Sequence, residues 1–198
     1  MMFLIAQTGI LMIGMFRPEA DVGYYTIAAK LATLTTFVLS AVDSMAGPKF
    51  SELYYADQMN DLFHVAKKSA KLIFVTTIPI LLVLLIFGKP ILTLVFGNEF
   101  AAAYPALVFL VVGQCVNSFS GSTGIFMNMT GNQNAFRNIM LIAACLNIGL
   151  NLWLIPYIGV NGAAISAMVS LWVWNLGTLA YMKLKFGKTT AYFPGLCI

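Results

Sequence analysis

Charged residues are scarce in this chain of 198 residues, at 9% of the total, whereas they make up roughly a quarter of a soluble domain. Apolar residues reach 60%, and the mean hydropathy is +0.87. The apolar residues form continuous runs and do not alternate with polar ones, which favours helices over an outer-membrane barrel. The sequence therefore predicts an all-α, polytopic membrane bundle of about six transmembrane helices.

Groups that perform catalysis are also few. The sequence holds one histidine, His64, in a polar stretch where a solvated surface role is expected, and it has no paired carboxylates, no metal-binding cluster and no Walker-type phosphate loop. The cysteines Cys115, Cys145 and Cys197 are widely spaced, and the first two fall in apolar runs, which indicates inert packing residues. We therefore expect no enzyme activity, no cofactor and no metal.

Basic residues outnumber acidic ones, 11 to 7, but membrane topology explains this excess better than nucleic-acid binding does. Arg17 and Lys89 lie on one side of the predicted membrane, and Lys30 lies within it. The other basic residues share the side of both chain ends: Lys49, Lys67, Lys68, Lys71, Arg137, Lys183, Lys185 and Lys188. The positive-inside rule places this side, with both termini, in the cytoplasm.

Six apolar segments are predicted to span the membrane and form a single lobe over residues 1–198: about 1–16, 22–47, 70–87, 101–129, 135–155 and 160–182. The polar segment 48–69 is expected to be cytoplasmic and amphipathic. Gly88-Lys89-Pro90 is predicted to end the third span before a short interfacial helix over 91–96. The N-terminus lacks a cationic start and a cleavage site, so it is predicted to be a short or truncated span rather than a signal peptide.

Residues 22–47 are apolar enough to cross a membrane but carry polar side chains along one side. Spacings of four and three place six residues in one narrow seam on a helix: Thr26, Lys30, Thr33, Phe37, Ser40 and Ser44. Only Phe37 interrupts the polar line. The sequence thus predicts a helix with one wet or partnered face, whose substrate-path candidates include Thr26, Lys30, Thr33 and Ser40.

Lys30 lies eight residues, about 12 Å, into this run. A charge at the centre of a membrane helix costs about 2.5 to 3.5 kcal/mol even on a permissive scale, so Lys30 is expected to face a cavity or a partner. The alternative is a lysine that snorkels to the headgroups or pairs structurally. Asp43, beside the seam, is a further path candidate, for which interfacial solvation or helix capping is the alternative.

The fourth predicted span carries a second stripe of polar and small residues along one side of the helix: Gln114, Asn117, Gly121, Gly124 and Asn128. Such a stripe either lets helices approach and hydrogen-bond or lines a hydrated cavity. Gln114, Asn117 and Asn128 are therefore path candidates too. Pro79, in the middle of the third span, frees a backbone carbonyl and is a hinge candidate, as is Pro105 near the start of the fourth.

Four stretches, in this order, carry a family resemblance: VGYYTIAAKL at 22–31, GPKFSELYYADQMNDLFHVAKKSAK at 47–71, PILTLVFGNEFAAAYPALVFLVVG at 90–113, and the segment from NMTGNQNAFRN to GAAISAMVS at 128–170. Together they resemble the C-terminal half of an O-antigen type polysaccharide-biosynthesis flippase. This family belongs to the multidrug, oligosaccharidyl-lipid and polysaccharide exporter superfamily. The similarity covers nearly the whole chain.

The resemblance implies two six-helix lobes around a central cavity that opens alternately to each membrane face. It implies a cell-membrane protein that moves polyprenyl-pyrophosphate-linked oligosaccharide to the outer leaflet, with membrane lipids as further partners and no nucleic acid. Lys30 would meet the pyrophosphate, and the hydroxyl and amide side chains would meet the sugars. Family members have about twelve to fourteen helices, so we expect this chain to be a fragment that lacks an N-terminal lobe, or a lobe that pairs with a separate partner or with itself.

Two other functions stay open at this stage. A drug or small-cation exporter of the same superfamily would use membrane-embedded carboxylates, and Asp43 alone is even partly embedded here. A non-transporting membrane scaffold is the other alternative, against which the polar seams count mildly.

Overall fold

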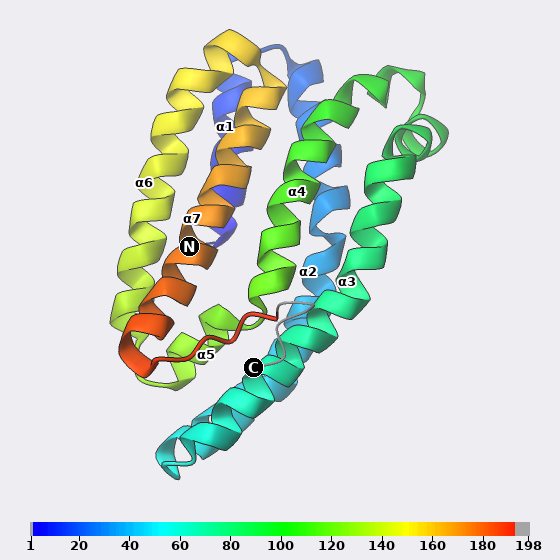
Figure 1. Ribbon diagram of the computed structural model, residues 1–198. Coiled ribbons are helices and arrows are strands. Elements are labelled where there is room, and N and C mark those ends of the chain that lie inside the picture. Colours follow the sequence, from blue (N-terminus) through cyan, green and yellow to red (C-terminus); the bar gives the residue numbers. More distant parts are fainter. Residues whose placement is uncertain (1, 193–198) are drawn as a thin grey trace.

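The computed structural model describes residues 2–192, and in this part of the chain every regular element is a helix (Figure 1). The elements in chain order are α1 (Met2–Phe16), α2 (Glu19–Tyr55), α3 (Met59–Phe96), the 3-10 helix η1 (Asn98–Ala103), α4 (Tyr104–Ser120), α5 (Thr123–Met129), α6 (Gln133–Ile158) and α7 (Val160–Phe186). Met1 and Cys197 lie outside the described residues. The all-α prediction is confirmed.

Five helical segments of the described chain are long and apolar enough to cross a membrane: α2, α3, η1 with α4, α6 and α7. The first predicted span, 1–16, corresponds to α1, whose 15 residues extend only about 22 Å, less than the roughly 30 Å hydrocarbon core. The chain is thus a multi-pass membrane protein with one short N-terminal helix.

The helices form two groups that meet where α4 packs against α7. In Figure 1, α1, α6 and α7 gather on one side and α2, α3 and α4 on the other, with α5 near one end. Within the first group, small residues let α6 and α7 approach closely: a Cβ on Gly162 would lie 2.6 Å from the Leu154 carbonyl carbon. Ser166 and Ser170 continue this buried stripe of small residues on α7.

The predicted break at Gly47-Pro48 is wrong, because α2 continues through it to Tyr55. Phe50 is fully buried and packs on Phe126 with ring centroids 5.6 Å apart, which fixes the last turns of α2 against α5. The segment predicted as amphipathic is therefore the end of α2, a short turn and the start of α3. Together they form an antiparallel hairpin that projects beyond α5 in Figure 1.

The helix break predicted at Gly88-Lys89-Pro90 is also wrong, since α3 runs on to Phe96 and absorbs the expected interfacial helix. A proline frees carbonyls in the preceding turn of a helix. Beside this turn, the hydroxyl of Tyr104 donates to the Leu85 carbonyl at 2.7 Å and ties α4 to α3. Gly88 packs so closely that an added Cβ would lie 2.8 Å from Leu107 Cδ2. Contacts from α4 thus hold α3 helical through its second proline.

The predicted fourth span is divided at Gly121, which has a φ of +70° and separates α4 from α5. A Cβ at Gly121 would lie 2.5 Å from the Cβ of Ala70, so α3 packs directly against the break. The C-terminal segment covers the last turn of α4, because the Tyr192 N–H donates to the Phe119 carbonyl at 3.2 Å. The freed backbone groups at the break therefore find partners from distant parts of the chain.

Candidate functional site: the exposed polar face of α2

The seam predicted on residues 22–47 forms an exposed face of α2. Lys30, Thr33, Ser40 and Ser44 are all exposed, and the Phe37 side chain is 80% exposed. Thr26, at the start of the seam, is half-buried. The opposite side of α2 is packed into the bundle through Ala28, Ala32 and Thr35, among others. A membrane helix that turns polar groups away from its own bundle requires water or another protein on that side.

The hydroxyl groups on this face donate back to their own helix. Thr33 Oγ1 donates to the Ala29 carbonyl at 2.9 Å, Thr36 Oγ1 to Thr33 at 2.6 Å, and Ser40 Oγ to Thr36 at 2.9 Å. Each donor is thereby satisfied, whereas the oxygen lone pairs still point outward. The face therefore offers a row of hydrogen-bond acceptors, to which the hydroxyl groups of a sugar could donate.

Lys30 is the one charged residue of this face. Its side chain is exposed and makes no hydrogen bond or ion pair with any residue in the described range 2–192. A structural partner is therefore not found in this part of the molecule. Lys30 presents three unused N–H donors and a full positive charge near the N-terminal half of a membrane helix, an arrangement suited to an anionic group.

Asp43 belongs to a different environment from the exposed face. It is half-buried and lies beside Ser122, at the break between α4 and α5. Its Oδ1 atom, together with Ser122 Oγ and Thr123 Oγ1, is buried without a hydrogen-bond partner. The structure thus separates Asp43 from Lys30 and Thr33, with which the sequence grouped it as a path candidate.

The second predicted stripe, on α4, is buried between α4 and α7. Asn117 Nδ2 donates to Gln114 Oε1 at 3.1 Å, and Asn175 Nδ2 of α7 donates to Asn117 Oδ1 at 3.3 Å. Sequence reasoning missed Asn175, because nothing in its spacing pairs it with α4. Paired amides at a helix interface stabilise packing, so Gln114 and Asn117 contribute to the bundle rather than to the α2 face.

Asn128, the last residue of that stripe, is exposed on the short helix α5. Its neighbour Phe126 packs on Phe50, which is 20 residues beyond Lys30 and so about 30 Å away along α2. The path candidates predicted from sequence therefore occupy three separate places: the exposed face of α2, the α4–α7 interface and the end of the bundle at α5.

The two hinge candidates differ in their positions. Pro105 lies in the first turn of α4, where a missing N–H removes no intrahelical hydrogen bond. Pro79 lies inside α3 and is exposed, so its ring leaves the Val75 carbonyl without the usual donor. Pro79 is thus a position at which α3 is locally weakened, and a hinge there stays a prediction.

The fold and this exposed face define a polytopic α-helical membrane protein. The chain belongs to the polysaccharide biosynthesis protein family, whose family model matches residues 1–105. This confirms the family resemblance of the sequence. No solved structure matches the chain.

Curated relatives include three proteins with related names. The chain is 26% identical to the probable low-salt glycan biosynthesis flippase Agl15 of Haloferax volcanii, over 81% of this chain and 34% of the relative. It is 27% identical to the probable flippase AglR of the same organism, over 87% of this chain and 36% of the relative. It is 23% identical to the succinoglycan biosynthesis transport protein ExoT of Rhizobium meliloti, over 99% of this chain and 39% of the relative. The chain thus spans little more than a third of these relatives.

Proposed function

We propose that this chain is one lobe of a flippase that moves polyprenyl-pyrophosphate-linked oligosaccharide from the inner to the outer leaflet of the cell membrane, in polysaccharide or O-antigen biosynthesis. The observation that carries the proposal is the exposed face of α2, with an unpaired lysine and a row of hydroxyls on a membrane helix. The names of the relatives, flippases and a transport protein of glycan biosynthesis, support it.

The chemistry of the face suits this cargo. The ammonium group of Lys30 would bind the pyrophosphate through charge-assisted hydrogen bonds, and the outward lone pairs of Thr33 and Ser40 would accept from sugar hydroxyls. Phe37 would provide an apolar surface between them for a sugar ring. The lipid tail of the cargo would stay in the bilayer, so the protein needs to shield only the polar headgroup.

A second lobe would complete the path. An exposed Lys30 facing hydrocarbon would be costly, and the curated relatives are almost three times as long as the matched region. We propose that a second lobe, from the same longer chain or from a separate partner, covers the α2 face. The two lobes would enclose a cavity that opens alternately to the cytoplasm, where both chain ends are predicted to lie, and to the outside.

Thiol labelling tests whether the α2 face lines an aqueous path. Thr33 lies 14 residues after the start of α2, and Leu82 lies 14 residues before the end of the antiparallel helix α3, so the two are at matched depth. Both are exposed in this structure. With the native cysteines replaced by serine, we expect Thr33→Cys to react with a water-soluble maleimide in cells, whereas Leu82→Cys, facing lipid, stays unlabelled.

The same experiment distinguishes the alternatives. A polyprenyl-pyrophosphate-linked oligosaccharide added to the purified, reconstituted protein should protect Thr33→Cys from the maleimide, and a phospholipid at equal concentration should not. Protection by a cationic dye instead would support a drug or small-cation exporter. A Thr33→Cys variant as inert as Leu82→Cys would reject the path and favour a scaffold.

A further inference from the structure

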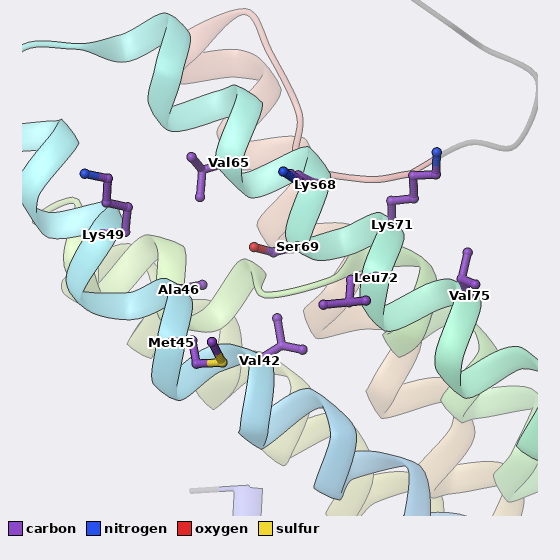
Figure 2. Close-up of a pocket in the computed structure, with 10 residues that line it drawn as sticks. All are labelled: Val42, Met45, Ala46, Lys49, Val65, Lys68, Ser69, Lys71, Leu72 and Val75. Carbon is purple, nitrogen blue, oxygen red and sulfur yellow. The ribbon is translucent and has the colours of Figure 1, made fainter.

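A groove of about 630 Å³ runs between α2 and α3 where their hairpin leaves the bundle (Figure 2). One stripe of each helix lines it, at spacings of three and four residues that place the members on one face. The lining residues are Val42, Met45, Ala46 and Lys49 of α2, and Val65, Lys68, Ser69, Lys71, Leu72 and Val75 of α3.

The groove changes from apolar to cationic along its length. Val42, Leu72 and Val75 line the part within the predicted membrane spans, and Leu72 and Val75 are 53% and 55% exposed. Lys49 and Lys68 lie toward the tip of the hairpin, on the predicted cytoplasmic side of the membrane boundary. The apolar part of the groove matches the acyl chain of a membrane lipid, and the lysines toward the hairpin tip match an acidic headgroup.

The lysines of the groove are not equally available. Lys68 lines the groove and makes no hydrogen bond or ion pair with the described residues 2–192. Lys49 pairs with Glu52 at 2.7 Å through one of its three donors, so two remain. Lys71 points away from α2, with its Nζ atom 5.9 Å from the centre of the Tyr192 ring. An anion in the groove would therefore meet Lys68 and Lys49 first.

The groove lies on a different side of α2 from the polar face. Ser40 and Val42 are two residues apart, which corresponds to about 200° of rotation around a helix. A ligand in the groove would contact α3, whereas the cargo proposed above would contact the opposite side of α2. The groove is therefore a second site that the proposed transport path does not use.

We propose that this groove binds an anionic phospholipid of the cytoplasmic leaflet, with the phosphate between Lys49 and Lys68 and an acyl chain along Val42, Leu72 and Val75. The lipid bridges α2 to α3 at the base of their hairpin. Charge complementarity selects an acidic headgroup, because zwitterionic lipids carry no net negative charge for the two lysines to bind.

Native mass spectrometry of the full chain, titrated with phosphatidylglycerol or phosphatidylcholine in neutral detergent, tests this site. We expect one phosphatidylglycerol bound more tightly than any phosphatidylcholine. The double variant Lys49→Gln/Lys68→Gln should weaken phosphatidylglycerol binding about ten- to thirty-fold, at roughly 1 kcal/mol for each lysine, and leave phosphatidylcholine binding unchanged. The control Lys89→Gln/Lys183→Gln removes two exposed lysines elsewhere and should change neither affinity.

A second measurement locates the lipid without any substitution that could affect folding. Phosphatidylglycerol with a photoreactive acyl chain should cross-link to the peptide that holds Leu72 and Val75. In the mass-spectrometry titration, an equal loss of phosphatidylglycerol affinity in Lys49→Gln/Lys68→Gln and in the control Lys89→Gln/Lys183→Gln would indicate diffuse electrostatic attraction and overturn the site. It would also be overturned if polyprenyl phosphate or free inorganic phosphate displaced the lipid at lower concentration than phosphatidylglycerol itself, or if cross-links fell outside α2 and α3.

Discussion

Replacing Lys30 with alanine is expected to reduce transport of lipid-linked oligosaccharide by about ten- to one-hundred-fold. A hydrogen bond to a charged group contributes about 1.5 to 3 kcal/mol, and each 1.4 kcal/mol corresponds to a tenfold change. Lys30→Arg should retain most of the activity, since it keeps the charge and the donors. The measurement is surface polysaccharide, together with the amount of lipid-linked precursor left in the inner leaflet, in cells whose native gene carries the variant.

Lys30 is exposed and has no partner in the described chain, so its removal should leave folding intact. The melting temperature of Lys30→Ala should therefore equal that of the unsubstituted protein. Lys89→Ala, which removes another exposed lysine at the far end of α3, is the matched control and should transport normally. Normal transport by Lys30→Ala would end the assignment of this residue to the pyrophosphate.

Gly121→Ala is expected to destabilise the bundle by about 2 to 6 kcal/mol, from two causes. Gly121 has a φ of +70° and a ψ of −150°, a backbone region essentially restricted to glycine, so alanine there costs of order 1 to 3 kcal/mol. Overpacking against a close neighbour costs about 1 to 3 kcal/mol more. The neighbour is Ala70, whose Cα and Cβ would lie 2.9 and 2.5 Å from the new Cβ. Unfolding in sodium dodecyl sulfate, followed by loss of helical circular dichroism, measures the change.

Gly131 provides the matched control for this prediction. It has the same φ of +70°, but no described atom lies within 4 Å of an added Cβ. Gly131→Ala should therefore lower the free energy of unfolding only by the cost of alanine at positive φ, about 1 to 2 kcal/mol. The double variant Gly121→Ala/Ala70→Gly should recover part of the loss. Equal destabilisation by the Gly121 and Gly131 variants would show that contact between α3 and the helix break contributes nothing.

The positions of the helix ends depend more on tertiary contacts than on local helix-breaking residues. Pro48 and Gly88-Lys89-Pro90 carry strong breaking signals, yet α2 and α3 continue through them. Burial of Phe50 and the hydrogen bond from Tyr104 to Leu85 offset the local cost. Gly121 carries a weaker signal, and the chain breaks there, because α3 approaches closely and the C-terminal segment covers the end of α4.

The same contrast applies to the candidate site. Two stripes of polar residues have the same helical spacing, and the sequence left both open between packing and a hydrated path. The stripe on α2 is exposed, whereas Gln114 and Asn117 on α4 are buried against Asn175, which is 58 residues away from Asn117 in the chain. Spacing within one helix cannot reveal a partner on another.

The sequence by itself determined the all-α membrane class, the family, and the polar stripe of α2, because hydropathy and helical periodicity are properties of consecutive residues. Only the tertiary structure decided which stripe faces outward, where the helices end, and that Asp43 turns away from Lys30 towards Ser122. Those features depend on which helices lie side by side. That arrangement is set by close packing between residues far apart in the chain, a contact that no local pattern encodes.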